Sequence, residues 1–380
     1  MAGSGTFRLF GRPEQVAVER GLAEFRSGRP VVVMSGDKGV MVLPVDGMTD
    51  EGLASFRLLC EPARPYLLVT ARRARALGLD RAAPTGLALG DLYDRSAIFS
   101  LAAHAQVTRR LDVIPAGAAA TAAIELAKLA QLLPALLVCE ATAQAANASE
   151  VPLVAVAADA VAQFRRTAIA TLAVVAEAAI PLSGGIPARF VIFRDAVGGT
   201  PIAVIVGKPD LAQPVLVRLH SACLTGDVFG SRRCDCGDQL RLALPQLAQR
   251  GGGIILYLEQ EGRGLGLANK IRAYQLQEAG LDTVDANTVL GFDDDERDYS
   301  VAVRMLQLLG CTRVRLLTNN PAKLDGLSQA GIDVSGRVPL HGPINADNRR
   351  YLAAKAARAG HKLDHILDVL TEAADESRES

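Results

Sequence analysis

Three cysteines in the second half of the chain have a spacing that suits a metal ion. Cys223, Cys234 and Cys236 form a C-x10-C-x-C pattern, and the glycine after the C-x-C pair favours a tight knuckle. Three thiolate ligands leave a tetrahedral zinc one position for water or substrate, as in catalytic sites. The pattern therefore predicts a catalytic zinc site. The spacing leaves two alternatives open, a closed structural site with His220 as fourth ligand and a cluster without metal.

Basic residues are frequent in the same part of the chain. In a protein of zero net charge, such a cluster beside a metal suits a phosphorylated substrate, because guanidinium groups pair bidentately with phosphate oxygens. An exposed helix face is the alternative explanation, above all for Arg232 and Arg272. The glycine-rich run 261–266 precedes a predicted helix, so its backbone N–H groups also suit an anion. The basic residues are Arg218, Arg232, Arg233, Arg263, Lys270, Arg272, Arg297 and Lys323.

Two further polar runs lie at the ends of predicted elements. Residues 293–298 place five carboxylates around Arg297 just before a helix expected at 298–309. This run is either an acidic first turn that complements the helix dipole or a site that holds a perturbed arginine. Residues 318–323 form a strand–turn–helix junction whose hydroxyl, amide and ammonium groups suit a phosphate or a base edge. An ordinary turn is the alternative there.

The elements that must position these motifs alternate between strand and helix. We expect strands at 189–193, 202–206, 215–220, 253–258 and 313–318, and helices through 240–247, 265–279 and 298–309. This order predicts an α/β domain with mixed sheets and some antiparallel pairing at its start. The alanine-rich first half predicts a strand at 30–34 and helices from about 118 to 180, and a turn-rich break at 183–187 places the domain boundary near residue 182.

Length and composition exclude several classes of protein. The 380 residues suffice for two or three domains, and six cysteines are too few for a disulfide scaffold. With 41 basic and 41 acidic residues and no tryptophan, neither nucleic acid nor a membrane is an expected partner. The start of the sequence has no apolar signal segment, so we expect a cytoplasmic protein, and the polar tail at 369–380 is predicted to be disordered.

The motifs between Val215 and Leu340 resemble GTP cyclohydrolase II. They are R-x-H-S-x-C-L-T-G-D, R-C-D-C-G-x-Q-L, Q-E-G-R-G-x-G-L, N-K-I-R-A-Y, D-E-R-D and L-L-T-N-N-P-x-K, in this order along the chain. The resemblance implies a zinc hydrolase of riboflavin biosynthesis that converts GTP to 2,5-diamino-6-ribosylamino-4(3H)-pyrimidinone 5′-phosphate, formate and diphosphate. It also implies a homodimer.

The resemblance assigns roles to residues of this sequence. It implies one zinc ion per chain at Cys223, Cys234 and Cys236, and Mg²⁺ is expected with the triphosphate. Asp295 resembles the proton acceptor and Arg297 the nucleophile, with Tyr274 beside the reacting ring. The implied GTP contacts are Arg218, Leu219, His220, Ser221, Ala222, Gln239, Glu261, Gly262, Arg263, Thr283, Thr318 and Lys323. Ala222 is a departure, since many members carry glutamate there.

The first half is similar to a degenerate 3,4-dihydroxy-2-butanone 4-phosphate synthase. The similarity lies in residues 28–33 and 124–140. That family has a dense acidic motif after its first strand, where this sequence keeps only Asp37, and a metal-binding histidine near the position of Ala119. Glu140 is retained, but it cannot assemble the site alone. We therefore expect a non-catalytic domain at 1–182, a GTP cyclohydrolase II domain at 183–368 and a tail at 369–380.

Two other functions stay open at this point. One is a paralogous enzyme that opens GTP or another purine ring for a different pathway. The other is a non-catalytic, nucleotide-binding zinc protein. The intact set of cysteines together with Tyr274, Asp295 and Arg297 argues against the second function.

Overall fold

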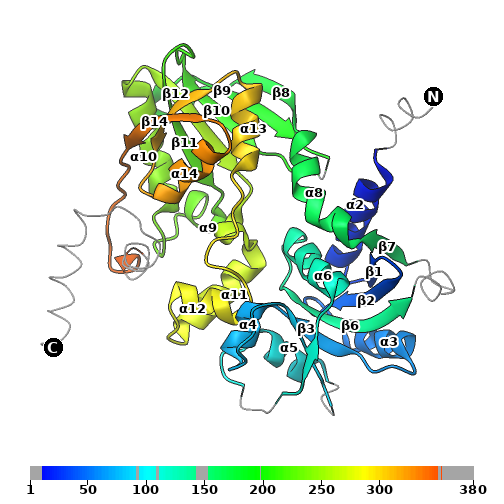
Figure 1. The fold of residues 1–380 in the computed structure, drawn as a ribbon. Helices are drawn as coiled ribbons and strands as arrows, with labels where there is room; N and C mark the ends of the chain where they lie inside the picture. Colours follow the sequence, from blue (N-terminus) through cyan, green and yellow to red (C-terminus); the bar gives the residue numbers. More distant parts are fainter. Residues whose placement is uncertain are drawn as a thin grey trace, which may run out of the picture. The chain divides into compact units, whose positions relative to one another are not determined.

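The computed structural model describes residues 11–90, 94–107, 111–142, 153–196, 198–349 and 352. The chain divides into two compact units, and Figure 1 shows their elements. The first unit consists of residues 1–167 and 265–296, and the second of residues 168–264 and 297–380. Each unit is described by itself. The domain boundaries expected at residues 182 and 368 stay predictions, and the tail 369–380 lies outside the described residues.

The first unit contains a seven-stranded sheet with the order β5-β4-β3-β6-β2-β1-β7. Neighbouring strands are antiparallel except β1 and β7, which are parallel. The strands are β1 (Val31–Ser35), β2 (Lys38–Pro44), β3 (Tyr66–Val69), β4 (Thr85–Leu87), β5 (Val113–Pro115), β6 (Ala135–Thr142) and β7 (Val154–Ala157).

Helices and buried side chains stabilise this sheet. Helix α6 packs against β1, β2, β3 and β6, and α2 packs against α6 and β7. A large apolar cluster joins alternate strand residues such as Leu67 and Val69 to Phe56 of α3 and Ile98 of α5, which fits the two-residue period of a strand. The helices from this part of the chain are α2 (Pro13–Arg26), α3 (Asp50–Cys60), α4 (Ala71–Ala76), α5 (Arg95–Ala103), α6 (Ala118–Leu129) and α8 (Ala158–Ala170), within which the division between the units falls.

Two helices from the second half of the sequence belong to the first unit. They are α11 (Leu267–Glu278) and α12 (Thr283–Val289). Helix α12 packs against α4, as Figure 1 shows. Ala273 of α11, Ala286 of α12 and Leu290, the residue after α12, belong to the same apolar cluster as Leu101 of α5.

The second unit contains another seven-stranded sheet, with the order β14-β13-β11-β12-β10-β9-β8. The four strands from β14 to β12 are parallel to their neighbours, and the pairs β12–β10, β10–β9 and β9–β8 are antiparallel. The strands are β8 (Ala173–Ala179), β9 (Ala188–Arg194), β10 (Ile202–Gly207), β11 (Val215–Ser221), β12 (Gly252–Leu258), β13 (Arg313–Leu317) and β14 (Asp333–Val338).

Two apolar clusters lie on the second sheet. One joins α10 to Leu216 and Ile255, and the other joins α13 and α14 to Val217 and Ile254. Neighbouring strand residues thus alternate between the clusters, which defines a three-layer arrangement. The helices are α9 (Leu224–Asp227), α10 (Cys236–Gln249), α13 (Ser300–Leu308) and α14 (Pro321–Gln329), with short 3₁₀ turns η1 (Ser183–Gly185) and η2 (Glu261–Gly264).

The structure confirms the α/β class and the mixed sheets, including the antiparallel pairing at the start of the second half. The expected strands of that half are present within a residue or two. The prediction of helices throughout 118–180 is wrong, because β6, β7 and β8 interrupt that region. Alanine favours helices locally, but pairing with neighbouring strands decides the outcome here. No described helix is long and apolar enough to cross a membrane.

Candidate active site

The predicted site residues of the second unit gather at one edge of its sheet. Strands β11, β12 and β13 are parallel, so their carboxyl ends lie at the same edge. Ligands of open α/β sheets bind outside this edge. The chain leaves β11 at Ser221, β12 at Leu258 and β13 at Leu317, and each exit leads directly into one of the motifs. The topology therefore brings together three motifs that are up to 100 residues apart.

The three predicted metal ligands converge beyond β11. The Sγ atoms of Cys223, Cys234 and Cys236 all lie within 4.8 Å of one another, and those of Cys223 and Cys234 are 3.7 Å apart. A tetrahedral zinc with Zn–S bonds of about 2.3 Å separates its sulfurs by about 3.8 Å, so the cluster fits this ion. His220 is not part of the metal-binding group found among the described residues, which disfavours the closed structural site.

The ionisation of these thiols also favours a cation. The neighbouring Cys223 thiol and burial raise the pKa of Cys234 to about 11. Thiolates crowded in a buried place repel one another, and a divalent cation removes that penalty. The cluster is therefore better suited to a metal ion than to three free thiols.

Glycines allow the two cysteine segments to approach. A Cβ atom at Gly237 would lie 2.0 Å from the carbonyl oxygen of Gly226, which real side chains never reach. A Cβ at Gly226 would lie 3.0 Å from the Sγ of Cys234 and 3.1 Å from the Sγ of Cys223. Backbone meets backbone at this point because neither residue carries a side chain.

Asp227 organises the segment that carries Cys223. Its carboxylate lies 3.0 Å from Nε2 of His220 and accepts hydrogen bonds from the backbone N–H of Cys223 and the hydroxyl of Tyr257, both at 3.0 Å. The His220 and Tyr257 rings stack with centroids 5.5 Å apart. Asp227 thus connects a predicted substrate contact to a predicted metal ligand. Neither Asp227 nor Tyr257 is among the predicted site residues, although Asp227 is the last residue of the motif R-x-H-S-x-C-L-T-G-D.

Burial keeps His220 neutral and leaves one of its nitrogens available. Desolvation lowers the pKa of His220 below its usual range, despite the hydrogen bond to Asp227. The Nδ1 atom is buried and has no hydrogen-bond partner within the described part of the chain. The same holds for Nε of Arg218 and Oγ of Ser221. Unpartnered buried polar atoms are rare, and three on one strand indicate a ligand-binding surface.

Arg218 and Lys323 supply buried positive charge at the same edge. Arg218 donates hydrogen bonds to the carbonyl of Leu317 at 3.0 Å and to Oε1 of Gln239 at 2.5 Å. Lys323 donates to the carbonyl of Leu219 at 2.8 Å. Both side chains are at most 6% exposed, and burial lowers the pKa of Arg218. Charges buried in this way interact strongly with an anion because solvent screens them little.

The glycine-rich run forms a left-handed turn. Gly262 and Arg263 both have φ close to +60°, a conformation that a non-glycine residue such as Arg263 seldom adopts. Glu261 accepts a hydrogen bond from the backbone N–H of Leu224 at 2.7 Å. The turn is therefore joined to the short helix α9 next to Cys223. Two further predicted contacts lie just after strand ends. The backbone N–H of Ala222 donates a hydrogen bond to the carbonyl of Leu258 at 2.8 Å, and Oγ1 of Thr318 accepts one from the N–H of Asn320 at 3.1 Å.

Three predicted site residues belong to the first unit. Tyr274 lies on α11 with Nζ of Lys270 5.6 Å from its ring centroid, and Thr283 is the first residue of α12. Asp295 is exposed and follows α12, whereas Arg297 belongs to the second unit, with its guanidinium 5.8 Å from the Tyr299 ring. The predicted residues are therefore distributed over both units.

The acidic run 293–298 is not the first turn of a helix. Helix α13 begins at Ser300, after the run, and its first turn contains no acidic residue; the carboxylate of Asp298 accepts a hydrogen bond from the N–H of Ser300 at 2.8 Å. Asp293 and Glu296 instead bind basic side chains of the first unit.

Two basic residues had an exposed helix face as their alternative explanation. Arg232 is exposed and pairs with Asp347, whereas Arg272 forms a half-buried ion pair with Asp46.

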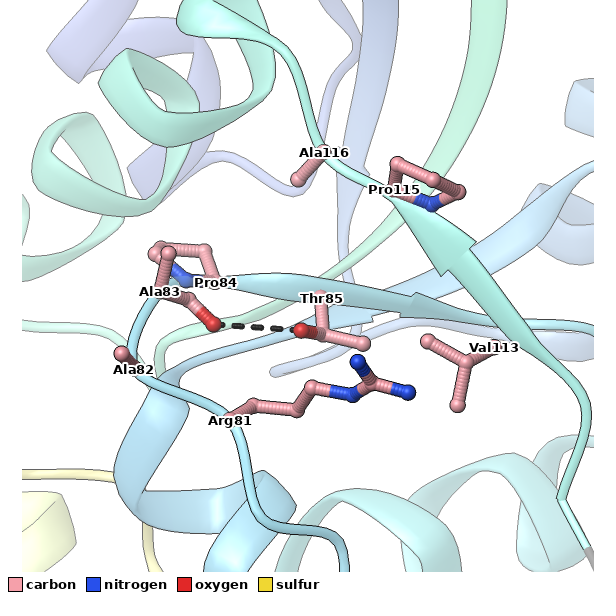
Figure 2. Close-up of a pocket in the computed structure, with 8 residues that line it drawn as sticks. All are labelled: Arg81, Ala82, Ala83, Pro84, Thr85, Val113, Pro115 and Ala116. Atoms are coloured by element: carbon pink, nitrogen blue, oxygen red, sulfur yellow. Dashed lines mark hydrogen bonds between the residues drawn. The ribbon is translucent and has the colours of Figure 1, made fainter.

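A pocket of about 400 Å³ lies beside β4 and β5 of the first unit (Figure 2). Arg81 is its charged residue, and Thr85 donates a hydrogen bond to the carbonyl of Ala83 at 3.1 Å. Neither Asp37 nor Glu140 lines this pocket, and both are exposed. It does not assemble the acidic groups that a sugar-phosphate enolisation needs.

The α/β fold carries a convergent thiol cluster that could hold a metal ion, beside buried cations at the carboxyl edge of its mixed sheet, an arrangement that suits a phosphorylated ligand. A family model described as GTP cyclohydrolase II matches residues 173–339. The chain is 43% identical over 361 residues to GTP cyclohydrolase-2 of Azospirillum brasilense, covering 91% of this chain and 93% of that protein. It is 41% identical over 358 residues to GTP cyclohydrolase-2 of Xylella fastidiosa, covering 93% and 89%.

A shorter match is to the riboflavin biosynthesis protein RibBA of Bacillus mycoides, at 55% identity over 163 residues, 43% of this chain and 41% of that protein. The long matches extend through both halves of the sequence. The chain belongs to the GTP cyclohydrolase II family.

Proposed function

We propose that this protein is a zinc-dependent GTP cyclohydrolase II. It would hydrolyse GTP to 2,5-diamino-6-ribosylamino-4(3H)-pyrimidinone 5′-phosphate, formate and diphosphate, the first step of riboflavin biosynthesis. The observation that carries the proposal is the convergence of Cys223, Cys234 and Cys236 beside unpartnered polar atoms of Arg218 and His220. The names of the long relatives, GTP cyclohydrolase-2, support the same reaction.

The three cysteines would hold one zinc ion per chain. When bound, zinc would supply Lewis acidity that lowers the pKa of water at the site towards neutral pH. Asp227 would fix the backbone of the Cys223 segment and the orientation of His220, since it binds both. The unpartnered Nδ1 of the neutral His220 would accept a hydrogen bond from the substrate rather than bind the metal.

The remaining site residues would bind and orient GTP. Arg218 and Lys323 offer buried positive charge, while Gln239, Thr318 and the turn 261–263 offer hydrogen-bonding groups. Leu219, Ser221, Ala222 and Thr283 complete the proposed contacts, and Mg²⁺ would neutralise part of the triphosphate. Tyr274 would polarise the ring or move its proton.

Asp295 and Arg297 would act on the α-phosphate. A guanidinium is protonated at neutral pH and is not a nucleophile in that form. Asp295, two residues earlier in the sequence, would accept its proton while Arg297 attacks the α-phosphate and diphosphate leaves. An electrostatic clamp by Arg297 is the alternative role. A homodimer and a cytoplasmic location also remain proposals.

The first unit would make no dihydroxybutanone phosphate. Asp37 lies in the turn between β1 and β2 and Glu140 lies on β6, and two exposed carboxylates do not form an enolisation site. Ribulose 5-phosphate with Mg²⁺ should therefore yield no formate above background.

Incubation of the purified protein with GTP, zinc and Mg²⁺ tests the proposal. Mass spectrometry should detect the pyrimidinone 5′-phosphate, with formate and diphosphate in equal amounts. Cys234→Ser should remove both the metal and the activity, whereas Cys311→Ser, at a buried thiol on another part of the unit, should leave them in place. A pyrimidinone that keeps its triphosphate would indicate the paralogous enzyme, and GTP binding without turnover would indicate the non-catalytic protein.

A further inference from the structure

Residues 265–296, which we call the held segment, lie within the family match but pack in the first unit. The held segment carries α11 with Tyr274, α12 with Thr283, and Asp295. Its buried residues Leu265, Ala273, Ala286 and Leu290 are part of the core cluster of the first unit. The first unit therefore shares a core with a segment that the proposed function needs for catalysis.

Arg73 anchors the end of α12. Its side chain is 1% exposed and donates hydrogen bonds to the carbonyls of Val289 at 3.0 Å, Leu101 at 2.8 Å and Ser100 at 3.0 Å. Val289 is the last residue of α12, so a cation lies at the negative end of the helix dipole. Burial lowers the pKa of Arg73 to about 10, which leaves it charged at neutral pH.

A close backbone approach adds to this anchor. The hydroxyl of Thr70 donates to the carbonyl of Gly291 at 2.7 Å. Gly291 has φ of +85°, and a Cβ atom there would lie 2.9 Å from Oγ1 of Thr70. Both the left-handed conformation and the contact require glycine at this position.

Ion pairs hold both ends of the segment. Asp46 binds Arg272 of α11 through two hydrogen bonds, of 2.6 and 2.9 Å. At the other end, Lys128 lies 2.8 Å from Glu296 and 3.8 Å from Asp293, while Arg72 lies 2.6 Å from Asp293. Asp295 lies between the two paired carboxylates in the sequence. Lys128 and Glu296 are both at most 14% exposed, so solvent screens this pair only partly.

We propose that the first unit, having no synthase activity of its own, positions the held segment for GTP ring opening, with Asp46 and Lys128 as positioning residues. This inference rests on the proposed function, since that function gives Tyr274 and Asp295 their roles. Neither Asp46 nor Lys128 belongs to the proposed contacts with GTP or metal. Their effect passes through Arg272 and Glu296, which set the placement of α11 and of the loop with Asp295.

The test compares Lys128→Met and Asp46→Asn with conservative and matched controls. Lys128→Arg and Asp46→Glu keep the charges, and Glu24→Gln removes a half-buried carboxylate of the same unit whose ion-pair partner is Arg29, outside the held segment. We expect kcat for formate release to fall about 10- to 100-fold in the first two variants, because small misplacements of reacting groups have effects of this size. KM for GTP and zinc content should stay at wild-type values, and the conservative variants should recover most of kcat.

Hydrogen exchange supplies a second readout that does not depend on activity. In Lys128→Met and Asp46→Asn, exchange should rise in peptides of residues 267–289 and stay unchanged in peptides of residues 236–258. Wild-type kcat in both variants would overturn the inference, as would equal losses of kcat in Glu24→Gln. If the wild type releases no formate from GTP, the proposed function fails instead, and the exchange data still decide whether Asp46 and Lys128 hold the segment.

Discussion

Asp227 connects three parts of the site through one carboxylate. One carboxylate binds the backbone of Cys223, the ring of His220 and the hydroxyl of Tyr257. Residues that orient metal ligands in this way commonly matter nearly as much as the ligands themselves. Asp227 is 4% exposed at its side chain, so its lost hydrogen bonds cannot be replaced by water without rearrangement.

We expect Asp227→Asn to weaken metal binding and turnover about 10- to 100-fold, because an amide accepts fewer hydrogen bonds than a carboxylate. Zinc content after dialysis against a weak chelator, and formate release from GTP, measure the two effects. Asp333→Asn, which removes an exposed carboxylate paired with Arg313 in the same unit, is the matched control. Full zinc retention in Asp227→Asn would show that the cysteines need no such support.

Arg297→Lys separates the two roles of that residue. A lysine keeps the positive charge but cannot replace the guanidine as a nucleophile in the same geometry. If Arg297 forms a covalent bond to the α-phosphate, the variant should release no diphosphate, and the wild type should show a transient guanylyl adduct by mass spectrometry. Diphosphate release by the variant at a substantial rate would leave Arg297 as a clamp.

The residues of the thiol cluster were predictable from the sequence, whereas Asp227 and Tyr257, which hold the Cys223 segment in place, were not. The C-x10-C-x-C spacing identifies Cys223, Cys234 and Cys236, and the structure brings them together. Tyr257 lies on β12 and donates a hydrogen bond to Asp227 of α9, which is 30 residues away in the sequence. Such contacts depend on strand order and register, which the local pattern of residues does not contain.

Between elements, the contact of Gly226 with Gly237 sets how closely the N-terminus of α10 approaches the Cys223 segment. We expect Gly237→Ala to separate the two segments, since its Cβ would overlap a backbone carbonyl that cannot move as a side chain can. Zinc content should fall steeply, together with the melting temperature of the zinc-loaded protein.

Gly336→Ala is the control for this substitution, because a Cβ at Gly336 on β14 would meet no atom within 4 Å. It should leave zinc content unchanged. Normal zinc content in Gly237→Ala would mean that the cysteine segments tolerate a wider separation than the structure has.

Elements were predictable where apolar and β-branched residues follow a clear period. Strands β11, β12 and β13 are short apolar runs that lead into turns, and their positions agree with the sequence. The alanine-rich region gave the opposite result, since β8 is Ala-Val-Val-Ala-Glu-Ala-Ala. Its two adjacent valines were the local sign of a strand, and its pairing with β9 decides the structure.

For the whole molecule, the two units have separate cores. Removal of zinc should therefore loosen the second unit far more than the first. On addition of a strong chelator, hydrogen exchange should rise in peptides of residues 215–258 and stay low in residues 31–44 and 135–141. Equal loss of protection in both sheets would show that the molecule unfolds as one cooperative unit.

The motifs alone do not indicate that residues 265–296 pack in the first unit. The family motifs follow one another from Arg218 to Lys323, and nothing in their spacing marks off this segment. The structure assigns residues 265–296 to the first unit because Arg73, Asp46 and Lys128 bind them there. These partners are more than 160 residues away in the sequence, too far for any spacing rule.

The division between the units is crossed three times by the chain, after residues 167, 264 and 296. A single proteolytic cut within α8 therefore yields two fragments that do not correspond to the two units. The larger fragment would carry residues 265–296 into the core of the smaller one, and the pair should stay together without a covalent link. Two separately expressed polypeptides, 1–167 and 168–380, should for the same reason copurify, as the halves of a split protein do.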